Sequence, residues 1–126
     1  MTSLKGLRVL VIEDDPDALD LNARMLERAG ATTLLAANMR QAIEAFRSGS
    51  PDVLLCDLDL GESVGGCDLL RSLNDVVGRS IPAIALSGTS KDQAGERARK
   101  AGFSAYLQKP TTAPALTRAI KAALKP

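Results

Sequence analysis

Five acidic residues stand at the ends of two short apolar segments of the sequence. They are Glu13, Asp14, Asp15, Asp57 and Asp59. Carboxylates are costly to bury without a partner, and two of them about 4 Å apart repel by roughly 4 kcal/mol at an effective dielectric constant of about 20. A cluster of these carboxylates therefore needs a cation. Oxygen ligands without Cys or His favour a hard ion, Mg²⁺ or Ca²⁺, and an open site at loop ends suits Mg²⁺, which keeps several waters.

Two more polar side chains follow the later apolar segments of the chain. Ser87 comes directly after the segment 81–86, and Lys109 directly after 104–108. A lysine ammonium suits a phosphate oxygen, and a serine hydroxyl can donate a hydrogen bond to another. Carboxylates, Mg²⁺, lysine and hydroxyl together describe a phosphoryl site. In such a site Asp57 would be the nucleophile and form an aspartyl phosphate, while the protein supplies positioning and charge neutralisation.

The elements that must position these residues are strands alternating with helices. The apolar segments predicted to be strands are 7–12, 32–36, 52–56, 81–86 and 104–108. Several are apolar continuously, which is typical of strands covered on both faces. Helical patterns lie between them, and the first begins at Pro16. Asn38 with Gln41, and Ser90 with Gln93, predict capping boxes at two later helix starts.

This alternation predicts an α/β fold, a doubly wound (βα)₅ domain with a five-stranded parallel sheet and helices on both faces. We expect the flavodoxin-like strand order 2-1-3-4-5. Ligands of such sheets bind beyond the carboxyl ends of the strands, at the switch point between strands one and three. Glu13, Asp14 and Asp57 would then converge there. Asp15, before Pro16, is instead expected to cap the first helix.

The composition of the chain argues against several other classes of function. The chain has 126 residues, which suits one domain over 1–126, and its net charge of +1 predicts no direct binding of nucleic acid. No apolar run approaches the length of a membrane span. Two cysteines without a metal or disulfide spacing favour a reduced, cytoplasmic compartment, with Cys56 in the core. The absence of histidine excludes Ser-His-Asp triads and histidine-based zinc sites within the chain.

Four motifs occur in order along this pattern. They are "VLVIEDDPD" at 9–17, "DVLLCD" at 52–57, "ALSG" at 85–88 and "AYLQKP" at 105–110. Each motif is weak alone. Together, at these separations, they resemble the receiver domain of two-component response regulators over the whole length of the chain. That resemblance implies a phosphoacceptor domain that takes its phosphoryl group from a phosphohistidine on a histidine kinase or a histidine phosphotransfer protein.

The resemblance also implies a role for each matching residue. Asp57 would be the phosphoacceptor, and Mg²⁺ would be bound by Asp14, Asp57 and the backbone carbonyl of Asp59, with Glu13 acting mainly through a water. The remaining implied roles concern the phosphate and the switch. Ser87 and Lys109 would bind the phosphoryl group, Tyr106 would be the switch aromatic, and the Lys109–Pro110 peptide bond would be cis. Phosphorylation would rearrange the face formed by the fourth helix, fifth strand and fifth helix, and so control a downstream protein partner.

One segment departs from the pattern of the family, and a second predicts a weakly packed helix. The stretch "LGESVGG" after Asp59 is rich in glycine, which predicts a loose loop and puts the Asp59 carbonyl and the Mg²⁺ affinity in doubt. The Asp59 carboxylate could either orient or repel a hydrolysing water. The fourth helical segment, 90–102, has Ala94, Ala98 and Ala101 on its inner stripe and Gly95 in its middle. Because alanines bury little area, we expect this helix to be weakly packed.

Several alternatives stay open from the sequence. "LCDLDL" also resembles the Asp-x-Asp motif of haloacid-dehalogenase-like phosphatases, although in that family the motif usually follows the first strand. A degenerate receiver that only binds partners is a third possibility, and a receiver could act alone or belong to a longer regulator. Tyr106 is equally well explained as a half-buried packing residue. Ala18 and Leu19 could contact a phosphodonor or pack in the core. We expect a self-modifying switch that is not a turnover enzyme.

Overall fold

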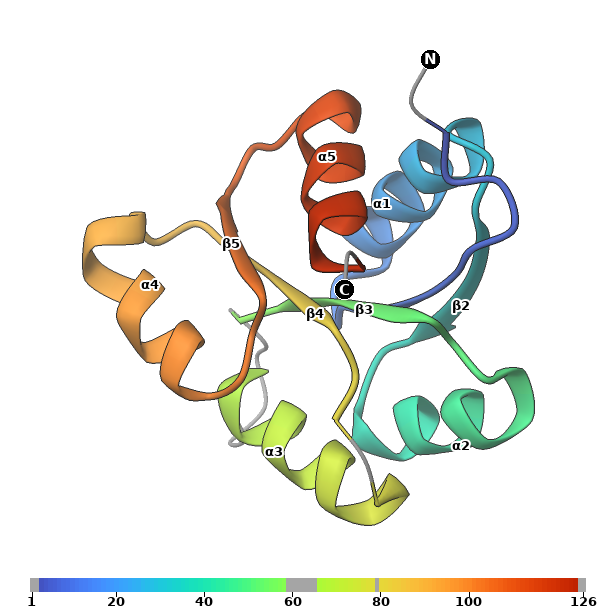
Figure 1. Ribbon diagram of the computed structural model, residues 1–126, viewed down its shortest axis with the longest axis horizontal. Coiled ribbons are helices and arrows are strands. Elements are labelled where there is room, and N and C mark those ends of the chain that lie inside the picture. The colour runs from blue at the N-terminus through green and yellow to red at the C-terminus, as the bar shows by residue number, and fades with distance from the viewer. Residues whose placement is uncertain (1–2, 59–65, 79, 125–126) are drawn as a thin grey trace.

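The computed structural model describes residues 3–58, 66–78 and 80–124 (Figure 1). These residues form five strands and five helices in strict alternation. The elements are β1 (Arg8–Ile12), α1 (Pro16–Arg28), β2 (Thr32–Ala36), α2 (Met39–Gly49), β3 (Val53–Asp57), α3 (Gly66–Val77), β4 (Ala83–Ser87), α4 (Lys91–Lys100), β5 (Ala105–Gln108) and α5 (Ala113–Ala123). All strand pairs are parallel, and the sheet order is β2-β1-β3-β4-β5, which confirms the predicted doubly wound fold.

The sheet separates two apolar cores. Because successive strand residues point to opposite faces, the continuously apolar strands fill both. Leu54 and Cys56 of β3 face a core shared with α2, α3 and α4. Val53 and Leu55 of the same strand face a core shared with α1 and α5. Figure 1 shows α1 and α5 together, away from α2 and α3. Cys56 is buried as predicted.

Helix starts agree with the sequence at two of three predicted caps. The Asp15 carboxylate accepts a hydrogen bond from the Ala18 N–H at 3.2 Å and so caps α1. The Asn38 side chain accepts from the Gln41 N–H at 2.9 Å at the start of α2. The capping box predicted at Ser90 is wrong. The Ser90 side chain makes no cap hydrogen bond, and α4 begins on the backbone carbonyl of that residue.

Register brings the polar residues to one edge of the sheet. Asp57 at the end of β3 pairs with Leu86 of β4, and Ser87 at the end of β4 pairs with Gln108 of β5. Ile12, the last residue of β1, pairs with Cys56. The residues that follow these strand ends therefore share the carboxyl edge, where open α/β sheets bind their ligands.

The helix α4 rests on the sheet through alanines. Ala94, Ala98 and Ala101 are buried, as the sequence predicts for its inner stripe. A hollow of about 210 Å³ lies between this helix and β5, and its lining includes Gly95 and Tyr106. Small side chains and an adjoining hollow leave α4 with little buried apolar area, so packing stabilises it weakly.

We predict that Gly95→Ala stabilises the domain. The added methyl group removes the helix-interior glycine penalty of about 1 kcal/mol and lies beside the hollow. Urea unfolding should show the gain in the free energy of unfolding, and amide exchange should slow across α4. The control Gly78→Ala should destabilise, because Gly78 has a φ of +77°. A loss of stability in Gly95→Ala would contradict the weak-packing interpretation.

Candidate functional site

A buried ion pair lies at the carboxyl edge of the sheet. The side chain of Asp57 is 3% exposed, and its Oδ2 atom accepts a hydrogen bond from Lys109 Nζ at 2.5 Å. Lys109 follows β5, and its backbone N–H donates to the Ser87 carbonyl at 2.7 Å, which fixes where the side chain starts. The Lys109 side chain is 33% exposed. The ammonium thus connects the buried carboxylate to the surface.

Glu13 adds a second buried carboxyl group to this pair. It follows β1 directly and its side chain is 3% exposed. One oxygen, Oε1, accepts from the Asp15 N–H at 3.1 Å. The other, Oε2, lies 3.8 Å from Lys109 Nζ and has no hydrogen-bond partner within the part of the chain that the structure describes. A single ammonium therefore stands between two carboxyl groups.

The pKa of Glu13 reflects its burial beside a second carboxyl group. Burial, together with the neighbouring Asp57 carboxyl group, raises the pKa of Glu13 from 4.5 to about 8. The Asp15 N–H and the Lys109 charge oppose this rise but do not cancel it. Desolvation disfavours the charged form of a carboxyl group, and a neighbouring carboxylate does the same. A cation near Glu13 and Asp57 would favour their charged forms and lower the pKa of Glu13.

This donor set fits Mg²⁺. Across residues 3–58, 66–78 and 80–124, no group of three or more His, Cys, Asp or Glu side chains is arranged to hold a metal ion. The buried pair, with one oxygen unsatisfied on Glu13, suits an ion that takes one or two carboxylates and keeps waters. Asp14 is half-buried. Asp59, its backbone carbonyl and the predicted loose loop lie outside the described residues.

Ser87 and Tyr106 meet at Thr89. Ser87 is buried at the end of β4, and its Oγ accepts from the Thr89 N–H at 3.1 Å. Tyr106 of β5 is half-buried against the core, and its hydroxyl donates to the Thr89 carbonyl. The sequence did not assign Thr89 a role, and its only signal was its position two residues after Ser87. The Lys109–Pro110 peptide bond is cis, as the resemblance implied.

Comparison with known protein families identifies the family of this chain. A family model described as "Response regulator receiver domain" matches residues 9–121, which include every residue placed above. The chain belongs to the response regulator receiver domain family. It is accordingly a phosphoacceptor receiver domain, a signalling module of two-component systems. The haloacid-dehalogenase-like alternative receives no support from these findings.

Relatives and solved structures agree with that assignment. The polar-differentiation response regulator DivK of Brucella anthropi is 32% identical over 117 residues, covering 92% of this chain and 94% of the relative. An uncharacterized 14.6 kDa protein of Leptolyngbya boryana is 32% identical over 96% of this chain and 92% of its own length. A receiver domain from Clostridium thermocellum is 29% identical with a TM-score of 0.81, covering 94% of both chains.

One further structure supports the fold alone. The chemotaxis protein CheY4 of Vibrio cholerae has a TM-score of 0.84 at 18% identity, covering 94% of this chain and 98% of that chain. Among the described helices of the receiver domain, none has both the length and the apolar character needed to cross a membrane.

The raised pKa of Glu13 predicts a pH dependence of stability in the metal-free receiver. Between about pH 4.5 and pH 8 the unfolded chain releases this proton while the folded chain keeps it, so the free energy of unfolding falls as pH rises. Urea unfolding should show this fall in wild type. It should be smaller in Glu13→Gln, which carries no proton to release, and smaller in wild type with Mg²⁺. Equal pH slopes in wild type and Glu13→Gln would show that Glu13 is not perturbed.

Proposed function

We propose that this receiver domain accepts its phosphoryl group on Asp57 from a phosphohistidine of a histidine kinase or a histidine phosphotransfer protein. The observation that carries the proposal is the 2.5 Å contact between Lys109 Nζ and Asp57 Oδ2, at the carboxyl edge of the sheet. An Asp57 carboxylate oxygen attacks phosphorus, and the bond between phosphorus and the donor imidazole nitrogen breaks. The electron pair leaves with the imidazole, and an acyl phosphate remains on Asp57.

The residues around Asp57 neutralise the transferred charge. Lys109 already stands at the carboxylate and can donate to a phosphoryl oxygen. Ser87 Oγ lies at the end of the adjacent strand and can donate to another. Mg²⁺ would be held by Asp14, Asp57 and the Asp59 carbonyl, with Glu13 through a water. When bound, the ion offsets the negative charge of the carboxylates and of the phosphoryl oxygens, and the unsatisfied Oε2 of Glu13 supports its presence.

The phosphodonor would dock beside Lys109, between α1 and the connection from β5 to α5. A cavity of about 390 Å³ lies there, and its lining includes Ala18, Leu21, Lys109 and Pro110. Leu21 is 59% exposed, the most exposed of the large apolar side chains that stand out on the described surface. Of the two α1 residues that the sequence suggested for donor contact, Ala18 lines this cavity, whereas Leu19 packs against the core. An apolar surface next to the acceptor suits the apolar face of a donor helix.

The response to phosphorylation would start at Thr89. If Ser87 Oγ turns toward the phosphoryl group, the Thr89 N–H loses its present acceptor, and the Thr89 carbonyl that holds Tyr106 shifts with it. The next residues begin α4, which is weakly packed. The α4–β5–α5 face would rearrange and change its affinity for a downstream protein. The domain would act as a phosphorylated switch and turn over no separate substrate.

The first test is chemical labelling of the acceptor. Incubation with acetyl phosphate and Mg²⁺ should add one phosphoryl group to wild type, read by intact mass. Asp57→Asn should gain none, and the exposed control Asp75→Asn should be labelled like wild type. A chelator should abolish labelling. Labelling of Asp57→Asn at the wild-type level, or no labelling of wild type, would contradict the proposal. Catalytic hydrolysis of p-nitrophenyl phosphate would contradict the non-enzymatic role.

The second test separates donor docking from chemistry. Leu21→Glu should lower the rate of transfer from protein donors about tenfold or more, because it places a charge in an apolar contact. Labelling by acetyl phosphate should be unchanged. The donors are the autophosphorylated histidine kinases and phosphotransfer proteins of the same genome, offered in parallel. Leu35→Glu, at another exposed leucine on β2, is the matched control. Equal losses in both variants, or none in Leu21→Glu, would place the donor elsewhere.

A further inference from the structure

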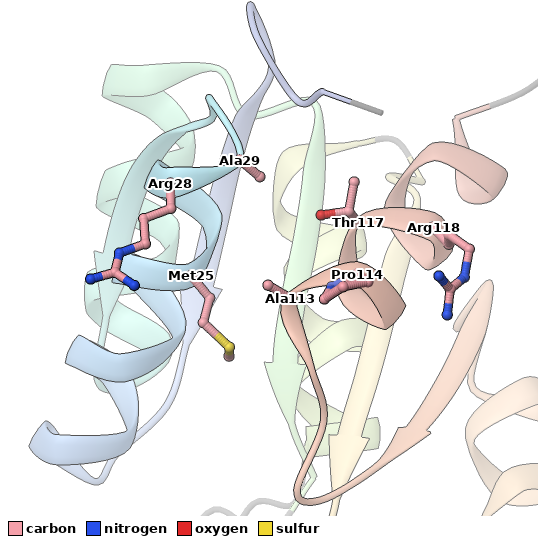
Figure 2. A pocket seen from close by; sticks show the side chains of 7 residues that line it. All are labelled: Met25, Arg28, Ala29, Ala113, Pro114, Thr117 and Arg118. Atoms are coloured by element: carbon pink, nitrogen blue, oxygen red, sulfur yellow. The ribbon is translucent and has the colours of Figure 1, made fainter. Parts of the chain in front are cut away.

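A second cavity lies between α1 and α5. Its volume is about 330 Å³, within the range of small-ligand sites in proteins. Met25 of α1 and Ala29, which follows the end of α1, face Ala113 and Pro114 of α5 across it, as Figure 2 shows. Lys109, the residue that holds the acceptor carboxylate, is not part of its lining. The walls are mostly apolar and come from two helices that share one core of the domain.

Thr117 gives this cavity a buried polar group. The residue is 7% exposed and belongs to the lining of the cavity. Figure 2 shows the hydroxyl oxygen on the side of α5 that faces α1. The hydroxyl can therefore donate to a ligand that enters the cavity.

The charges at the cavity favour an anion. Arg28 and Arg118 stand at its two sides, both exposed, and neither forms an ion pair with another described residue. No acidic side chain belongs to the lining. In Figure 2 both guanidinium groups point away from the space between the helices. Long arginine side chains lose several rotamers when they are fixed, and a bound anion offsets that cost with charge-assisted hydrogen bonds.

We propose that the α1–α5 cavity binds a small organic anion with an apolar body, such as an aromatic carboxylate or sulfonate. The apolar body would lie against Met25, Ala29 and Pro114. The Thr117 hydroxyl would donate to its polar group, and Arg28 and Arg118 would turn inward to pair with its charge. The site does not depend on phosphorylation of Asp57. Because Met25 also lines the donor cavity, the bound ligand would contact the edge of the donor surface.

A pair of probes with the same kind of ring system tests the site. Anilinonaphthalene sulfonate carries an apolar body and an anionic group, and phenylnaphthylamine lacks the anionic group. Fluorescence titration should show tighter binding of the sulfonate, and amide chemical shifts should move at Met25, Ala29 and Thr117. Equal affinity for both probes would overturn the anionic class. Shifts confined to Ala18 and Leu21 would assign the probe to the donor cavity and overturn the site.

Three variants of the intact domain complete the test. The double variant Arg28→Gln/Arg118→Gln should bind the sulfonate on the order of tenfold more weakly. Thr117→Val, which keeps the side-chain shape, should weaken it about fivefold, with folding checked by thermal unfolding. Arg47→Gln removes an exposed arginine of α2 far from the lining and should leave affinity unchanged. Equal weakening in Arg47→Gln would show non-specific attraction and overturn the proposal, as would full affinity in the double variant.

Discussion

The structure of this domain depends on holding two buried carboxyl groups beside one ammonium. Glu13, Asp57 and Lys109 come from the ends of β1, β3 and β5, and they meet only because the sheet order places β1 next to β3. A buried charge without a partner costs several kcal/mol, so Lys109 stabilises Asp57, and Glu13 keeps its proton to about pH 8. The three side chains are compatible with a stable fold, but one ammonium group faces two carboxyl groups, so positive charge is deficient. That deficiency supports the proposed binding of Mg²⁺.

Strand positions could be predicted from the sequence because both faces of the sheet are covered. Continuous apolar runs leave few alternatives for a short segment between helical patterns. Where a predicted strand boundary differs from the structure, the cause is local. The fourth segment was expected at 81–86, but β4 begins at Ala83, after Pro82, whose missing N–H cannot join the strand pairing. The cap at Ser90 failed because a cap depends on one side-chain rotamer, which residue type favours but does not fix.

In the site, as in the fold, the topology could be predicted from the sequence but the side-chain contacts could not. Four site residues could be assigned to one edge of the sheet because each lies at a strand end or directly after one: Glu13, Asp57, Ser87 and Lys109. The sequence could not show that Lys109 binds Asp57 directly, because that contact depends on the path of the chain after β5. The sequence could not show that Thr117 is buried in the wall of a cavity either. A threonine between apolar helix positions is exposed about as often as it is buried. The Asp59 carbonyl and its loop stay predictions.

The helices around the sheet are unequally packed, which suits the proposed switch. On one side α1 and α5 pack through Leu26, Leu116 and Ile120, which are buried. On the other side α4 contributes alanines to the core. In the proposed switch, a change at the carboxyl edge would meet well-packed α1 and α5 on the donor side and weakly packed α4 on the output side. Thr89 stands at that boundary, because it bonds both Ser87 and Tyr106 just before α4 begins. A small displacement of Ser87 would be absorbed where packing resists least, in α4 and in Tyr106 across the hollow from it.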